Sequence, residues 1–162
     1  MKTEGMQSVP PLGLFIIKAG LVGSHAEYPR ASNVLRVPPE GNEEACAWYE
    51  RAYRGADLAM VTLEDHQALC AIEDREAAIR AVCALPPPEV VIKCGAEPTL
   101  LRLAGQAPVA VPVFKVSKVV DTTGAGDSFA GAYLAARLQG LSPEVSARSG
   151  NKLASIVIQH AG

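Results

Sequence analysis

Apolar positions follow two different periods along the chain, and the changes of period predict its elements. Continuous apolar runs bounded by turn residues predict buried strands over 57–63 and 90–94. Apolar residues at helical spacing predict helices over 43–54, 64–70, 74–85, 130–138 and 143–159. Asn42 and Ser142 stand where helix caps are expected, and Gly55 ends the first of these helices. The chain therefore alternates between helical and strand patterns over most of its length.

Shorter apolar runs complete the predicted sheet. Residues 99–103 and 109–114 flank Gly105-Gln106 and predict a hairpin. The β-branched run 116–120 has a strand pattern, and Leu12–Gly23 predicts a buried strand with a glycine turn. This order favours an α/β fold with a mostly parallel sheet flanked by helices. Ligands of such sheets bind beyond the carboxyl ends of the strands.

The length and the net charge of the chain limit which classes of function are expected. The chain has 162 residues, of which 49% are hydrophobic, so one domain with a real core is expected. The net charge of −2 provides no electrostatic footprint for nucleic acid. Leu12–Gly23 is interrupted by Lys18 and is too short to span a bilayer, so no membrane partner is expected. The four cysteines are widely spaced, which predicts thiols in a reducing cytoplasm and not a zinc site.

The stretch from Asp121 to Phe129 is the strongest chemical signal. Its glycines, Gly124 and Gly126, let the backbone approach a ligand closely. The helix that follows begins with unpaired N–H groups and the positive end of its dipole, which suits a phosphate. Asp127 places a carboxylate at this anion site, where it would otherwise repel the ligand. The presence of this carboxylate is explained if Asp127 is a general base that accepts a proton from an attacking hydroxyl. The alternative is an ordinary helix start with an acidic residue in its first turn.

This stretch closely resembles the C-terminal signature of the ribokinase-like (PfkB) family of carbohydrate kinases. The resemblance implies that Asp127 is the catalytic base and that the amides of Gly124, Ala125 and Gly126 form the anion hole. Within the family, the chain is most similar to the branch that phosphorylates keto-sugar acids such as 2-keto-3-deoxygluconate. The similar segments are collinear over 40–162, so the resemblance implies the C-terminal part of a kinase domain, with 1–39 unassigned.

Nucleotide-binding positions follow from the same resemblance. Gly95 matches a glycine near the ribose and phosphates of ATP, and Lys93 precedes it closely. Asn151 matches a position beside the adenine; a polar residue on a helix flank is the alternative. Thr62 and Asp65 occupy the positions of an Asn-x-x-Glu motif that organises Mg²⁺-bound water in relatives. Asp65 keeps an acidic residue at the glutamate position of this motif, whereas Thr62 replaces its asparagine. The alternative for Asp65 is that it is an ordinary acidic residue at the start of a helix.

The remaining assignments concern the acceptor and a second cation. Asp121 and Thr123 match residues near a monovalent cation, although a turn-forming aspartate is an equal alternative. Arg36 lies in a segment similar to an Asn-x-Arg sequence that supplies an arginine to the acceptor's carboxylate, with a register offset of one residue. The N-terminal half of such a kinase, which holds most of the sugar pocket and its lid, has no recognisable counterpart here.

The function implied by the resemblance is transfer of the γ-phosphoryl group of ATP, with Mg²⁺, to a hydroxyl of a small keto-sugar acid. Two alternatives stay open. One is a kinase of the same family that acts on another sugar or on a nucleoside. The other is a noncatalytic nucleotide-binding or interaction module, for which exposed apolar surface would favour association, including homo-oligomers.

Overall fold

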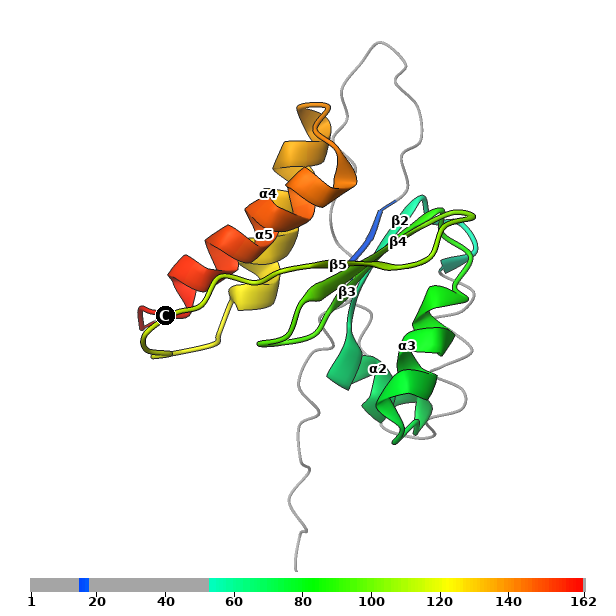
Figure 1. Cartoon of the computed structure of the whole chain (residues 1–162), viewed down its shortest axis with the longest axis horizontal. Helices are drawn as coiled ribbons and strands as arrows, with labels where there is room; N and C mark the ends of the chain where they lie inside the picture. The colour runs from blue at the N-terminus through cyan, green and yellow to red at the C-terminus, as the bar shows by residue number, and fades with distance from the viewer. Residues whose placement is uncertain (1–14, 18–52, 162) are drawn as a thin grey trace, which may run out of the picture.

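A mixed five-stranded sheet is the centre of the fold. The computed structural model describes residues 15–17, as backbone, and 53–161, and Figure 1 shows their arrangement. In chain order the elements are β1 (Phe15–Ile17), β2 (Leu58–Thr62), α2 (Leu63–Cys70), α3 (Arg75–Cys83), β3 (Glu89–Lys93), β4 (Thr99–Leu103), β5 (Val109–Val111), α4 (Ala125–Leu138) and α5 (Pro143–Val157). The strands lie in the sheet in this same order.

The direction of the strands differs from the expectation of a mostly parallel sheet. In the described residues only β2 and β3 pair in parallel, and the other three pairs are antiparallel. The parallel pair is joined through α2 and α3, as a parallel connection requires. β3, β4 and β5 follow one another through short turns, which allow only antiparallel pairing. The hairpin around Gly105 was predicted correctly.

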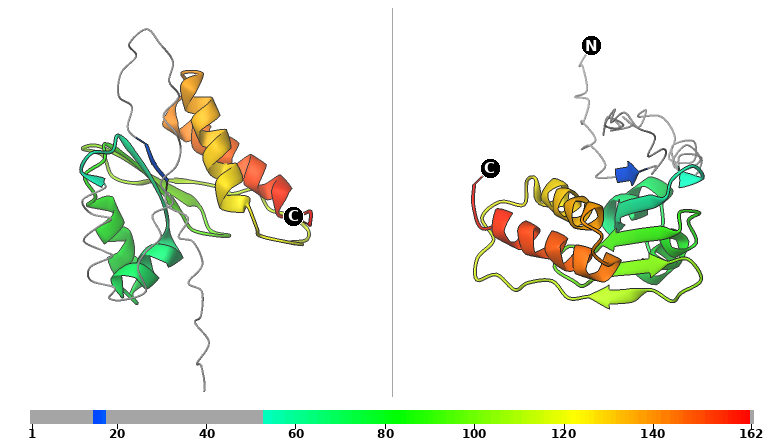
Figure 2. Two further views of the ribbon diagram at one scale, coloured as in Figure 1. Left: turned by 180° about the vertical axis from the view of Figure 1, so that it is seen from behind. Right: turned by 90° about the horizontal axis from the view of Figure 1, so that it is seen from above.

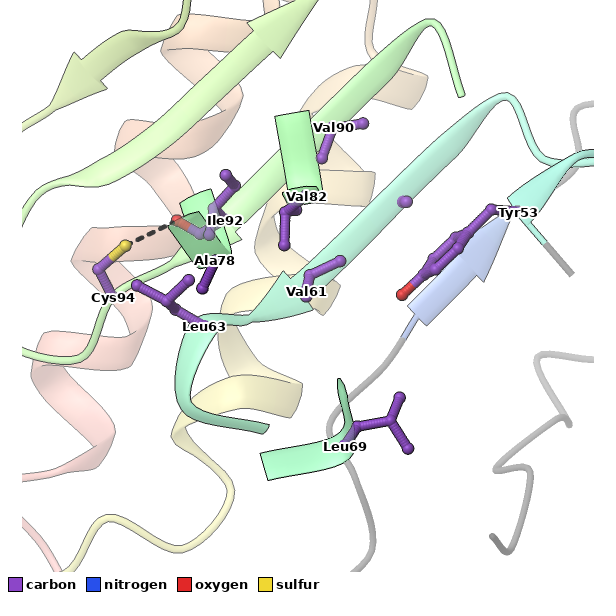
Figure 3. Close-up of a cluster of buried hydrophobic side chains, with 10 residues drawn as sticks. Tyr53, Val61, Leu63, Leu69, Ala78, Val82, Val90, Ile92 and Cys94 are labelled. Carbon is purple, nitrogen blue, oxygen red and sulfur yellow. Dashed lines mark hydrogen bonds between the residues drawn. The ribbon is translucent and has the colours of Figure 1, made fainter. Parts of the chain in front are cut away.

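The two faces of the sheet carry separate cores, because successive strand residues point to opposite sides. Ala59, Val61, Val90 and Ile92 pack with α2 and α3, as Figure 3 shows for most of them. Met60, Val91 and Leu101 instead pack against Phe129 and Tyr133 of α4. Figure 2 shows the helix pairs on opposite sides of the sheet. Each parallel strand is buried on both faces, which explains its continuous apolar run.

The expected helices in the described residues are present, with ends shifted by one or two residues except at α4, which begins at Ala125 and not at Ala130. Asp74 Oδ1 accepts a hydrogen bond from the Ala77 amide, and Ser142 Oγ accepts one from the Val145 amide. These side chains cap α3 and α5, and the Ser142 cap was predicted from the sequence. The helix predicted over 43–54 lies outside the described residues, except for its last positions.

The run 116–120 is not a strand, so that expectation is wrong. It belongs to a long irregular connection between β5 and α4. Val119 is 53% exposed, and the Val120 amide donates to Ile158 O at 2.8 Å, at the end of α5. The β-branched residues thus favour an extended backbone, but no neighbouring strand in the described residues pairs with it. Pro112, which has no N–H group, immediately follows β5.

One cysteine expectation is also wrong. Cys70 is disulfide-bonded, whereas Cys83 and Cys94 are free thiols. A bond to a distant cysteine depends on how the chain folds back, and spacing along the sequence does not reveal it.

Candidate active site

The carboxyl ends of the parallel strands β2 and β3 meet at one edge of the sheet. Thr62, the last residue of β2, is the register partner of Lys93, the last residue of β3. Thr62 is also the N-cap of α2, so the first turn of that helix, with Glu64 and Asp65, begins at the same edge. This is the position at which α/β proteins bind their ligands.

The Gly124–Asp127 turn starts α4 beside this edge. Gly124 is the N-cap and has a φ of 74°, which glycine adopts without strain. The Asp121 carboxylate accepts a hydrogen bond from the Thr123 amide at 2.8 Å and so shapes the turn just before the helix. The Ser128 amide donates to Gly124 O at 2.9 Å, which closes the first helical turn. Asp127 lies within that turn and is exposed.

The two helices that begin here lack side-chain caps. Neither Thr62 at α2 nor Gly124 at α4 provides a side-chain hydrogen bond to its helix. By contrast, α3 and α5 carry Asp74 and Ser142 caps. An uncapped helix start leaves amide groups available to an anion, and the helix dipole adds to the attraction.

Lys93 connects the two helix starts. It is only 9% exposed, and its Nζ lies 3.1 Å from the point that a Cβ on residue 126 would occupy. Burial lowers the pKa of Lys93 below its ordinary value. Three carboxylates oppose this effect, with Asp65 the strongest, followed by Asp127 and Glu64. The ammonium group therefore faces acidic residues from both α2 and α4.

Gly95 follows Lys93 at the end of β3. Its φ of 62° requires the left-handed region, and a Cβ there would lie 3.7 Å from Glu64 Oε1. The Gly95 backbone thus comes close to the start of α2. Thr62, Lys93, Gly95, Asp65 and Asp127 are brought to one region of the molecule. Their roles toward a ligand stay predictions.

Asn151 lies apart from this group, on the side of α5 that faces the sheet. Its Oδ1 accepts a hydrogen bond from Thr99 Oγ1 at 2.8 Å. Its Nδ2 donates to Val111 O at 3.3 Å and to Pro112 O at 3.1 Å. These bonds give the buried amide a structural role that joins α5 to β4 and β5. Contact with adenine stays a prediction.

The described part of the chain holds no group of three or more His, Cys, Asp or Glu side chains arranged for a metal ion. Mg²⁺ commonly uses one or two carboxylates together with substrate phosphates, so Asp65 and Asp127 fit a metal that arrives with a nucleotide. Asp121 and Thr123 form the turn already described, and a role in binding a monovalent cation stays a prediction. Arg36 lies outside the described residues.

Sequence reasoning missed two features of the site. One is the closeness of Lys93 to the Gly126 turn, and the other is the influence of the Glu64 charge on Lys93. A lysine at the end of an otherwise apolar strand was the available signal, since a buried cation needs nearby carboxylates. Glu64 was visible only as an acid in the first turn of α2.

An open groove of about 540 Å³ lies elsewhere, between α4 and α5. It is lined by Ala132, Val145, Arg148, Ser149, Lys152, Leu153 and Ile156. None of these belongs to the predicted site, and the groove is mainly apolar. No helix in the described residues is long and apolar enough to cross a membrane.

A sheet with helices on both faces and a glycine-containing helix start at the carboxyl edge of its parallel strands is typical of α/β proteins that bind ligands at that edge. The sequence profile of the pfkB family carbohydrate kinases matches residues 28–162. The chain belongs to this family.

Comparison with individual relatives supports the same family assignment. The chain is 42% identical over 122 residues to the 2-dehydro-3-deoxygluconokinase of Escherichia coli strain K12, a match that covers 74% of this chain and 40% of that protein. It is 38% identical over 125 residues to the enzyme of the same name from Dickeya dadantii, with 76% and 40% covered. The chain thus spans about 40% of the length of these curated relatives.

Solved structures confirm the ribokinase-like fold. A probable sugar kinase from Rhizobium etli superimposes with a TM-score of 0.67 at 27% identity, covering 74% of this chain and 36% of that one. Arabidopsis thaliana ribokinase, solved with ribose and ATP, gives a TM-score of 0.61 at 26% identity, covering 70% and 38%.

Proposed function

We propose that this chain provides the phosphoryl-transfer part of an ATP-dependent sugar kinase whose acceptor is a keto-sugar acid of the 2-dehydro-3-deoxygluconate type. One observation carries the proposal. The uncapped start of α4, with Asp127 in its first turn, lies against the buried cation Lys93 at the carboxyl end of β3. In this proposal, an anion hole and a base from the start of α4 act beside a cation from the end of β3.

Each residue has a definite chemical task in this proposal. The Asp127 carboxylate accepts the proton of the acceptor hydroxyl as its oxygen bonds to the γ-phosphorus. The bond between that phosphorus and the bridging oxygen breaks, and ADP leaves with the electron pair. Amides from Gly124 to Gly126 stabilise the charge on the transferring group. Mg²⁺ neutralises phosphate charge when bound, and Asp65 is positioned to hold its water.

Other predicted residues would bind the reactants. Thr62, Lys93 and Gly95 lie where the phosphates and ribose would approach the strand ends. Asn151 would act on the adenine side, and Arg36 would pair with the acceptor's carboxylate. A requirement for a monovalent cation near Asp121 and Thr123 is part of the same proposal.

The keto-sugar acid is preferred to other acceptors because of the relatives. The 2-dehydro-3-deoxygluconokinases match over 122–125 residues at up to 42% identity. A ribokinase from Arabidopsis thaliana matches over only 74 residues at 35%. An adenosine kinase from Schizophyllum commune reaches 42% but over 81 residues. A ribose, fructose or nucleoside kinase is the alternative within the family.

The experiment combines calorimetry and an assay. Titration of the purified chain with Mg²⁺-ATP tests nucleotide binding, and ADP release tests transfer to 2-dehydro-3-deoxygluconate, ribose, fructose and adenosine. ADP release stimulated by the keto-sugar acid alone supports the proposal. Preference for another acceptor favours the alternative kinase. Complete failure to bind ATP would favour the noncatalytic interaction module.

A further inference from the structure

Three polar side chains join the last turns of α4 to the first residue of β3, at the opposite end of the strand from the candidate site. The Glu89 carboxylate, whose side chain is only 13% exposed, accepts hydrogen bonds from Tyr133 and Arg137. Arg137 donates from Nε to one carboxylate oxygen at 3.1 Å and from Nη2 to the other at 3.0 Å. The proposed phosphoryl transfer does not use these residues, so the cluster needs another explanation.

The contact between Arg137 and Glu89 is directional. An arginine that donates through two nitrogens to both oxygens of one carboxylate is fixed in orientation as well as in distance. Arg137 Nη1 also donates to Leu141 O at 2.8 Å, which attaches the turn after α4 to the same cluster. Apolar packing, such as that of Val91 with Phe129, is non-directional and tolerates a small shift of a helix along a strand. The Glu89 cluster therefore resists a shift of α4 that the core alone would allow.

α4 runs along β3 in the opposite direction, and alternate residues of the strand face it. Glu89 contacts the end of α4, Val91 belongs to the core beneath it, and Lys93 Nζ lies 3.1 Å from the Cβ position of residue 126 at its start. The strand covers about 13 Å from Glu89 to Lys93. About nine residues of helix separate Gly126 from the middle of the Glu89 contact, and they cover about 14 Å. The two lengths match, so the contact at one end of α4 and the place of the turn at the other are set together.

We infer that Glu89 is a positioning residue, which through Arg137 sets the position of α4 along β3 and so places the Gly124–Asp127 turn at the carboxyl end of the strand. What this placement does for phosphoryl transfer rests on the proposed function, whereas the placement itself does not. A slip of α4 by one residue would carry the turn about 1.5 Å along the strand. A displacement of about 1 Å is enough to impair a near-attack geometry.

The test compares Arg137→Lys with Val82→Ala in the 162-residue chain. Lysine keeps the positive charge and replaces the planar fork with a point charge, so Arg137→Lys removes the directional contact. Val82 is fully buried in the core on the other face of the sheet, away from α4. Its variant lowers stability by leaving a cavity there, and it is the matched control for a general loss of stability.

The measurement is the nuclear Overhauser effect between the Lys93 methylene next to Nζ and the Hα protons of Gly126. One of these Hα protons occupies the Cβ direction, so the two groups are neighbours in the unmodified chain. The effect falls steeply with distance, so a slip toward 1.5 Å in Arg137→Lys should weaken it about twofold or more. The amide resonances of the turn should shift as well. Val82→Ala should leave both unchanged.

Glu89→Gln is a second variant, because its amide group meets the guanidinium of Arg137 donor to donor and breaks the fork. It should weaken the same effect, and either variant decides alone if the other does not fold. An unchanged effect in a folded variant overturns the inference. So does an equal loss in Val82→Ala, or the absence of the effect from the unmodified chain.

Calorimetry with Mg²⁺-ATP tests the link to the site. Displacement of the turn amides in Arg137→Lys should lower the affinity about threefold or more, and Val82→Ala should retain it. Unchanged affinity in a chain whose turn has moved overturns the link between Glu89 and the site. If the unmodified chain binds no ATP, the proposed function fails, and the comparison of the Overhauser effects still decides whether Glu89 positions α4.

Discussion

Asp127 is a negatively charged side chain at a place that would also attract a negatively charged ligand. It lies in the first turn of α4, where a carboxylate is stabilised by the helix dipole, and it faces the Lys93 ammonium group. The same place would attract a phosphate. The proposed base would therefore lie close to both the proposed anion hole and the Lys93 cation.

The first prediction concerns this carboxylate. Asp127→Asn keeps the shape of the side chain and removes its basicity, so it should lower turnover by roughly 10²-fold or more. ATP affinity should remain nearly intact, because the amides of the turn stay in place. Steady-state kinetics with calorimetry of the same variant check both parts. Turnover close to that of the unmodified protein would exclude Asp127 as the base.

The two glycines of the turn serve different purposes, which gives a second prediction. A Cβ at Gly126 would approach Lys93 Nζ at 3.1 Å, whereas Gly124 has open space but a φ of 74°. Gly126→Ala should displace the ammonium group and reduce ATP affinity with little loss of stability. Gly124→Ala should instead destabilise the fold by about 1 kcal/mol through backbone strain. Calorimetry and urea unfolding of both variants separate these effects; equal behaviour would contradict them.

The free thiols allow a third prediction at the residue scale. Burial raises the pKa of Cys94, with Glu64 and Glu97 adding to the effect and Arg75 opposing it. Burial likewise raises the pKa of Cys83, against the influence of Arg102. Because the thiolate is the reactive form, both should react slowly with iodoacetamide at pH 8 and faster as the pH rises. Mass spectrometry of the native chain, compared with the chain in urea, measures this. Equal rates in the two states would refute it.

At the scale of elements, α4 and α5 are held together by close packing. Gly150 of α5 faces the Phe129 ring, and a Cβ on Gly150 would lie 2.7 Å from that ring. Phe129 itself stacks on Tyr133, with ring centroids 6.0 Å apart. Tyr133 donates a hydrogen bond to Glu89, which also pairs with Arg137 at 3.0 Å. The helix that presents Asp127 is thus attached to both α5 and the start of β3.

A fourth prediction uses two glycines of this helix pair. Gly150→Ala should destabilise the chain by about 1–3 kcal/mol, because the new methyl group overlaps a buried ring. Gly131→Ala is the matched control, since no atom lies within 4 Å of its Cβ position. It should be neutral or stabilise by up to about 1 kcal/mol, since glycine is a poor helix former. Urea unfolding decides between them, and equal losses would refute the packing argument.

The elements also show what the sequence could predict. The runs that became β2 and β3 were predicted within a residue or two because strands buried on both faces have a continuous apolar pattern. The Asp127 turn was singled out because its glycines and acid have a chemical reason to occur together, and its role stays a prediction. The run 116–120 was misassigned, since strand formation depends on a partner that propensity does not specify. The meeting of Lys93 with Gly126 depends on tertiary packing and leaves no local pattern.

At the scale of the whole molecule, apolar surface stands out. Leu138 is 88% exposed, and Val145, Leu153 and Ile156 of α5 are 39–45% exposed. The last three line the groove between α4 and α5. Exposed apolar surface of this kind favours association between protein molecules. The oligomeric state of the chain in solution should therefore be measured at each concentration used for the assays.

The last prediction limits the proposed function itself: the 162-residue chain should phosphorylate 2-dehydro-3-deoxygluconate far more slowly than the complete Escherichia coli relative, of which it matches 40%. Phosphoryl transfer requires both reactants to be held at near-attack distance and shielded from water. The described residues include the turn that is proposed to handle the phosphoryl group and the Lys93 cation. Of the residues predicted to meet the acceptor, only Asp127 lies among them.

ADP release by equal concentrations of the two proteins measures this difference, with Asp127→Asn as the background. We expect weak ATP binding and a rate above that background but far below that of the complete relative, because an ordered nucleotide without an ordered acceptor gives little transfer. A rate comparable to that of the complete relative would contradict the prediction. It would mean that residues outside the described part, or a second copy of the chain, supply the acceptor pocket, and light scattering during the assay would separate those two sources.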